Sequence, residues 1–177
     1  MLIDHYREHS LALPELRRYL HQARRAAGLR GKFSVCLTDD EEVRVLNARF
    51  RGMDKPTDVL SFPAEAEDDE FPSPEPAAAP GAYLGDIVIS LDTAARQAAA
   101  LGHDLDQEVR ILILHGLLHL AGYDHETDQG EMRELESQLR SRLGLVQGLI
   151  ARAEAPAPPA SRAKARPRSR PPARTSR

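Results

Sequence analysis

The segment ILILHGLLHLA, residues 111–121, contains no charged side chain, and its only polar side chains are two imidazoles. Its length and composition predict a long apolar helix over about residues 107–120. His115 and His119 are four positions apart, so both rings project from the same face of that helix. The fold must therefore accommodate two neighbouring imidazoles on a helix rich in Leu and Ile.

A third histidine follows within a short distance. His125 lies ten positions after His115, and Gly122 between them can adopt the left-handed conformation at which a helix stops and the chain turns back. A single histidine on an apolar face is usually a hydrogen-bonded core residue, but three grouped rings would leave several nitrogens without partners. The pattern H-x3-H-x5-H therefore predicts that His115, His119 and His125 bind one metal ion.

Three imidazole ligands are typical of a catalytic zinc site, because the fourth position of tetrahedral Zn²⁺ stays open for water. A zinc peptidase of the common type would carry H-E-x-x-H, in which the Glu is the general base. Gly116 occupies that position here. Asp124, next to His125, has two open interpretations: it orients a ligand ring, or it only forms the turn.

The other candidate groups lack such a pattern. Four histidines stand in scattered polar contexts, and we expect their rings to face solvent: His5, His9, His21 and His103. Cys36 lies in the apolar run FSVCLT and is expected to be a buried structural thiol.

Helix signals divide the rest of the chain. Pro14 begins a helix that Gly28 ends, and Asp39 or Asp40 caps a second helix. The second helix is expected to bury the stripe of Val43, Leu46 and Phe50, and Asp92 to cap a third helix.

The predicted elements alternate between helices and strands. In order they are a short strand at 2–4, a helix at 14–27, a strand at 32–38, a helix at 40–50, strands at 57–62 and 85–91, and helices at 93–102, 107–120 and 130–144. This order predicts an α+β fold, a small mixed sheet of about four strands covered by about five helices.

The charge of the chain is divided unevenly. Residues 1–150 hold 16 Lys and Arg against 26 Asp and Glu, a net charge of −10, whereas residues 151–177 hold 8 against 1, a net charge of +7. We expect one domain over 1–150, with an acidic, Pro-rich surface loop at 64–82, and a disordered basic tail at 151–177. The chain shows no signal peptide and no apolar run long enough for a membrane span, so we expect a cytoplasmic protein with no membrane partner.

Three stretches together resemble one known family. HGLLHLAGYDH (115–125), LNARFRGMDKPTDVLSFP (46–63) and YLGDIVIS (83–90) are similar to the signatures of the YbeY-type bacterial endoribonucleases, with matching order from about residue 33 to 140. The resemblance implies one zinc ion on His115, His119 and His125, cleavage of single-stranded RNA, and a role in ribosomal RNA maturation and ribosome quality control. It also implies the small ribosomal subunit and its assembly factors as partners.

The same resemblance implies that Arg51 is a catalytic residue. A guanidinium can form two parallel hydrogen bonds with phosphate oxygens and stabilise charge that accumulates at phosphorus. Thr57 and Asp58 are expected to shape the turn before the strand, and Asp86 to do similar structural work. Basic side chains are expected near the metal: Arg24, Arg25, Arg30, Lys32, Arg49, Arg51 and Lys55.

Two alternatives to the endoribonuclease stay open on the sequence. One is a zinc peptidase-like hydrolase with an unusual general base, against which Gly116 and Arg51 argue. The other is a ribosome-assembly factor without catalytic activity, in which the zinc ion only stabilises the fold.

Overall fold

A computed structural model describes residues 1–5, 9–64, 81–125 and 127–145. Most of the predicted acidic loop at 64–82 and the whole predicted tail at 151–177 lie outside these residues. The described elements are β1 (Leu2–Asp4), α1 (Leu13–Ala26), β2 (Lys32–Thr38), α2 (Asp40–Arg51), β3 (Val59–Pro63), β4 (Tyr83–Ser90), α3 (Leu91–Leu101), α4 (Leu105–Leu120) and α5 (Glu131–Leu143). The predicted α+β fold, with a four-stranded mixed sheet and five helices, is confirmed.

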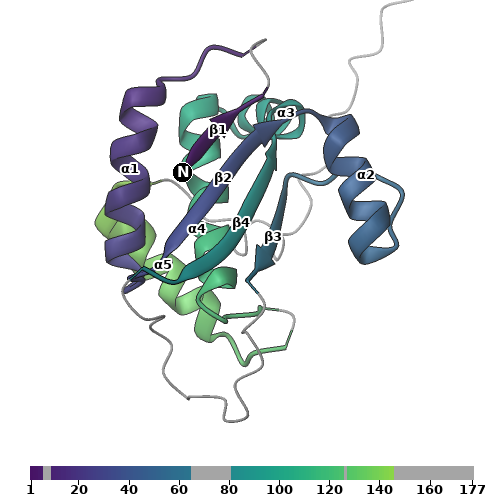
Figure 1. Ribbon diagram of the computed structural model, residues 1–177. Coiled ribbons are helices and arrows are strands. Elements are labelled where there is room, and N and C mark those ends of the chain that lie inside the picture. Colours follow the sequence, from purple (N-terminus) through teal and green to yellow (C-terminus); the bar gives the residue numbers. More distant parts are fainter. Residues whose placement is uncertain (6–8, 65–80, 126, 146–177) are drawn as a thin grey trace, which may run out of the picture.

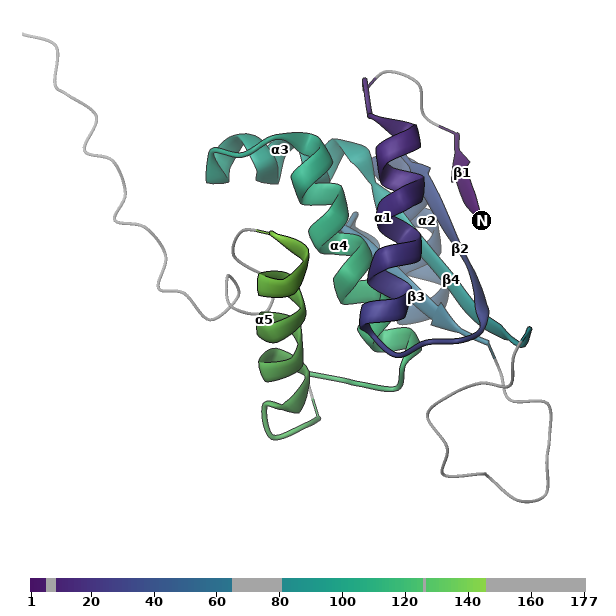
Figure 2. The same cartoon turned by 90° about the vertical axis from the view of Figure 1, so that its left-hand side faces the viewer.

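The four strands form one sheet in the order β1-β2-β4-β3. β1 and β4 pair with β2 in parallel, and β3 pairs with β4 antiparallel, which leaves β3 at an edge. Alternation along the strands directs Val35 and Leu37 of β2 and Ile87 and Ile89 of β4 into the main core. That core lies on the face of the sheet where α1 and α4 pack (Figures 1 and 2).

Helix α4 is the central helix of the molecule, which explains its apolar sequence. Leu112, Ile113 and Leu117 belong to the core against the sheet. Leu114 and Leu118 pack on the other side against Met132 and Leu139 of α5, which lies beyond α4 in Figure 2. A helix with neighbours on both sides needs apolar residues on almost its whole circumference.

Helix α2 packs against the opposite face of the sheet. Its Val43 forms a small cluster with Leu60 of β3 and Val88 of β4, and Leu46 packs partly against that cluster. Asp39 caps the helix by accepting a hydrogen bond from the backbone N–H of Glu42, and Gly52 ends it in the left-handed conformation with φ of 70°.

Several local predictions were wrong. Ser90, not Asp92, caps α3, because its hydroxyl accepts from the backbone N–H of Thr93. Phe50 is not buried with Val43, since 56% of it is exposed. The His103 side chain is only 12% exposed and contacts the buried carboxylate of Glu108.

Cys36 is half-buried instead of fully buried, and it lies on the α2 face of the sheet beside the cluster of Val43, Leu60 and Val88. Burial, with the nearby carboxylates of Glu42, Asp86 and Asp4, raises the pKa of its thiol. In the described part of the chain, no helix combines the length and the apolar character that crossing a bilayer requires.

Candidate metal centre

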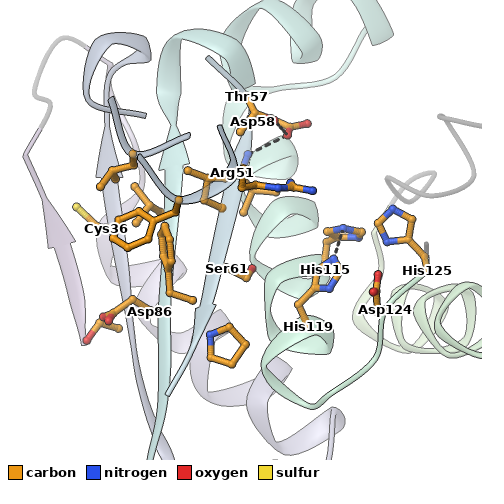
Figure 3. Close-up of a pocket in the computed structure, with 18 of the residues that line it drawn as sticks. Cys36, Arg51, Thr57, Asp58, Ser61, Asp86, His115, His119, Asp124 and His125 are labelled. Atoms are coloured by element: carbon orange, nitrogen blue, oxygen red, sulfur yellow. Dashed lines mark hydrogen bonds between the residues drawn. The ribbon is translucent and has the colours of Figure 1, made fainter. Parts of the chain in front are cut away.

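The structure brings the three predicted ligands together. His115 and His119 project from one face of α4 toward the edge strand β3, and His125 returns to them from the turn after the helix (Figure 3). Gly122 makes that return possible with a φ of 88°, a conformation that a side chain would disfavour. Each imidazole offers one nitrogen, and these three atoms lie within 4.8 Å of one another.

The distances fit a shared ion. The Nε2 atoms of His115 and His119 are 3.1 Å apart, close to the roughly 3.3 Å that separates two nitrogens bound to one tetrahedral Zn²⁺. The ring of His125 is centred 5.2 Å from that of His115 and 5.4 Å from that of His119. His125 is the exposed member of the group, so its ring can adjust by rotation about its side-chain bonds. The donor set therefore fits a single metal ion.

Glu136 of α5 holds the most buried of the three rings. Its Oε1 lies 3.3 Å from Nδ1 of His115, and both residues are almost completely buried. A carboxylate oxygen accepts a hydrogen bond from Nδ1–H, and this tautomer leaves a lone pair on Nε2. That lone pair faces the point shared with His119, which is the arrangement that metal-binding histidines commonly show.

The surroundings also keep His119 neutral. Burial lowers the pKa of His119 to about 4, with further lowering by the nearby His115 and His125, against an opposing effect of Asp124 and a backbone hydrogen bond with Tyr123. At neutral pH the imidazole is therefore unprotonated, the form that binds a metal.

The imidazoles open into a large cavity of about 1540 Å³. It extends from the histidines past β3 to the face of the sheet where α2 packs. The charged side chains that line it are Arg51, Asp58, Asp86 and Asp124.

Arg51 lies at the C-terminal end of α2 and reaches this cavity. Its guanidinium extends toward the rings of His115 and His125 in Figure 3. Among the seven basic residues expected near the metal, Arg51 alone is part of the described cavity lining. Arg24 instead donates a hydrogen bond to the carbonyl oxygen of Gly31, away from the site.

Hydrogen bonds to Asp58 shape the turn that leads into β3. Oδ1 of Asp58 accepts hydrogen bonds from the backbone N–H of Val59 at 2.8 Å and from the Thr57 hydroxyl at 3.2 Å. Oδ2 accepts from Gln97 of α3 at 2.9 Å. The structural role expected for Thr57 and Asp58 is therefore confirmed.

Two further acidic residues do structural work as well. Asp86 accepts a hydrogen bond from the Tyr83 hydroxyl on the α2 face of the sheet. Asp124 accepts from the Thr127 hydroxyl at 3.1 Å, and its carbonyl oxygen accepts from the backbone N–H of Asp128 at 2.9 Å. Asp124 thus forms the turn that carries His125, and its charge opposes the lowering of the pKa of His119.

Gly116 faces the sheet rather than the cavity. A Cβ atom at this position would lie 2.9 Å from Cγ2 and 3.0 Å from Cδ1 of Ile87. The packing of α4 on β4 therefore leaves no room for the glutamate of an H-E-x-x-H site.

Glu136 was not predicted from the sequence as a partner of the metal site. The buried residues of α5 are Met132, Glu136 and Leu139, which follow the i, i+4, i+7 spacing of one helix face. An acidic residue on an apolar stripe is a signal that could have been read, because a buried carboxylate requires a partner.

The chain is similar to a family of known proteins. Residues 7–144 match the family described as "Endoribonuclease YbeY". Relatives of that name include one from Koribacter versatilis, 50% identical over 159 residues that cover 90% of this chain and 92% of the relative. Another, from Nautilia profundicola, is 54% identical over 120 residues that cover 68% of this chain and 78% of the relative.

A solved structure is similar as well. The solution structure of TM1509 from Thermotoga maritima matches with a TM-score of 0.53 and 29% identity. The match covers 81% of this chain and 89% of that protein.

Proposed function

Because the chain belongs to the Endoribonuclease YbeY family, we propose that it is a zinc-dependent endoribonuclease that cleaves single-stranded RNA. We place its activity in the maturation of ribosomal RNA and in ribosome quality control, in the cytoplasm. The small ribosomal subunit and its assembly factors are the partners. The observation that supports this function best is a convergent set of three histidines that shares one cavity with an arginine.

His115, His119 and His125 would hold the zinc ion. An ion held by these three side chains would act as a Lewis acid in the cavity. Glu136 keeps the His115 ring in the orientation and tautomer that binding requires.

Arg51 would bind the phosphate group of the RNA. Its planar guanidinium can form two parallel hydrogen bonds with the oxygens of one phosphate group. Because it extends toward the imidazoles, it can hold the scissile phosphate beside the histidine cluster. The same positive charge would stabilise the negative charge that develops on the phosphate during displacement.

The site is poorly suited to peptide hydrolysis. A zinc peptidase of the common type relies on the glutamate after the first histidine. Gly116 stands at that position, where a Cβ atom would lie 2.9 Å from Cγ2 of Ile87. The carboxylates of Asp58 and Asp124 are engaged in turns.

A substrate panel tests the proposal. Zinc-loaded protein is incubated with a single-stranded RNA, the duplex of the same sequence and an unstructured peptide, each with and without a chelator. We expect cleavage of the single strand alone and its loss with the chelator. Peptide cleavage would favour a peptidase, and absence of all cleavage in folded, zinc-loaded protein would favour an assembly factor.

A further inference from the structure

Phe50 is placed unusually for an aromatic residue. Among the described residues, only Met1 is a more exposed large apolar side chain, and Phe50 is 56% exposed. It stands in the last turn of α2, directly before Arg51, and both residues line the cavity that contains the histidines. Exposure of a phenyl ring to water is unfavourable, so a ring held open inside a functional cavity indicates a ligand with an apolar surface.

The Phe50 ring is held in a defined position. Its centroid lies 5.0 Å from that of Phe62 in β3, and the two planes meet at 66°, a stable edge-to-face arrangement. The guanidinium carbon of Arg49 lies 5.2 Å from the Phe50 centroid, within the range of a cation–π contact. A ring that is ordered before binding loses little entropy when a ligand stacks on it.

The rest of the cavity identifies the class of ligand. An arginine that can hold phosphate and a cluster of metal-binding imidazoles lie beside Phe50, so the ligand carries phosphate next to a flat apolar group. A nucleotide within a single strand has both, and its base is free to stack only when it is not paired. The volume of about 1540 Å³ exceeds the roughly 300–1,000 Å³ of common small-molecule pockets.

We propose that Phe50, supported by Phe62, is a stacking site for an unpaired base of the RNA strand whose phosphate Arg51 holds. This inference rests on the proposed function and explains its preference for single strands. Stacking on an aromatic ring tolerates any base, because every base has a flat π-face. The site therefore contributes affinity and position, not recognition of a particular base.

Binding of two strands that differ only in their bases tests the proposal. Zinc-loaded protein is titrated with labelled 2′-O-methyl decauridylate and with an abasic strand of the same length, and fluorescence anisotropy gives each Kd. We expect wild-type protein to prefer the base-bearing strand. Phe50→Leu, which keeps an apolar side chain without a π-face, should weaken binding of the decauridylate about tenfold and leave the abasic strand unaffected.

Two further variants complete the experiment. Phe50→Trp should restore the preference for bases. Val45→Ala removes another exposed apolar side chain of α2, one that is not among the described cavity lining, and should change neither Kd. If Phe50→Leu keeps the full preference for the base-bearing strand, or if its binding of both strands weakens equally, the stacking site is wrong. Wild-type protein that cleaves RNA without preferring bases overturns the stacking site alone, whereas absence of RNA cleavage overturns the proposed function.

Discussion

The binding chemistry of a histidine depends on which of its two nitrogens carries the proton. In His115, the Nδ1 atom faces the carboxylate of Glu136, so Nε2 is left for the metal. His119 has a pKa lowered by burial and is unprotonated at neutral pH. These two effects prepare the ligands before an ion binds.

Removal of the Glu136 carboxylate should weaken zinc binding. We expect Glu136→Ala to lower zinc affinity about 10- to 100-fold, because the His115 ring loses the partner that fixes its tautomer. Glu136→Gln, whose amide oxygen can still accept a hydrogen bond from Nδ1–H, should lose less zinc affinity. Competition titration with a zinc-binding dye measures the affinities.

Glu134→Ala is the matched control, since Glu134 is exposed on the same helix. A folded Glu136→Ala protein with wild-type zinc affinity would show that the carboxylate contributes only to packing.

Arg51 should affect catalysis without affecting the metal. We expect Arg51→Ala to lower the cleavage rate of single-stranded RNA about 10²- to 10³-fold, the usual effect of losing a group that stabilises transition-state charge. Arg51→Lys keeps the charge but loses the two parallel hydrogen bonds, so it should recover only part of the rate. Zinc affinity should be unchanged in both variants.

Arg17→Ala provides the comparison, because Arg17 is an exposed arginine of α1 that is not among the described cavity lining. Equal rates for Arg51→Ala and Arg17→Ala would remove Arg51 from the mechanism.

Helices and strands set the positions of these side chains, and local sequence predicts them unevenly. Apolar content predicted the long helix, and the spacing of His115, His119 and His125 predicted that their rings converge. The conformational freedom of glycine predicted the left-handed backbone at Gly122. The start of α3 did not, because Ser90 and Asp92 are both good capping residues and only the backbone geometry at the end of β4 selects Ser90.

Periodicity also failed at Phe50. The residue has the helical spacing of a core position, but its ring contacts only the edge-strand residue Phe62 of β3 among the described aromatic rings and is otherwise open to the cavity. The strand order and the approach of Glu136 to His115 depend on contacts between distant segments, which periodicity does not encode. Arg51 was identified by family resemblance, since an arginine at the end of a helix is ordinarily solvated.

The β3–β4 pair depends on a glycine. Gly85 has a φ of 131°, and a Cβ atom there would lie 2.1 Å from the carbonyl oxygen of Phe62. We expect Gly85→Ala to lower the free energy of unfolding by about 2 kcal/mol or more, because backbone strain and a backbone collision combine. Urea denaturation measures the loss.

Gly102→Ala separates the two causes. Gly102 has a φ of 76°, but no atom lies within 4 Å of the position that a Cβ atom would occupy there. Its substitution should therefore cost only the backbone strain, about 1 kcal/mol. Equal losses for the two variants would contradict a specific contact between the strands.

The distribution of charge over the whole chain matters for an RNA substrate. Residues 1–150 carry a net charge of −10, and residues 151–177 carry +7. An acidic body repels phosphates at long range, whereas the basic segment attracts them with a strong dependence on salt.

Deletion of residues 151–177 should therefore weaken RNA binding most at low salt. We expect the plot of log K against log salt to become less steep, because fewer counterions are released from the RNA. Anisotropy titrations of a single-stranded RNA at several salt concentrations measure the two slopes. Parallel slopes for the full and shortened chains would show that the basic segment does not contact RNA.

If His115, His119 and His125 hold one catalytic ion, zinc content and RNA cleavage must change together in the same preparation. Metal-free protein is titrated with zinc, and bound metal and cleavage rate are recorded at each step for the wild type and for His119→Ala. We expect the wild-type rate to rise in proportion to bound zinc and to saturate at one ion per chain, while His119→Ala neither binds zinc tightly nor cleaves RNA. Cleavage that is independent of bound zinc, or a full zinc site in a folded protein that leaves RNA intact, would contradict a catalytic ion at the three histidines.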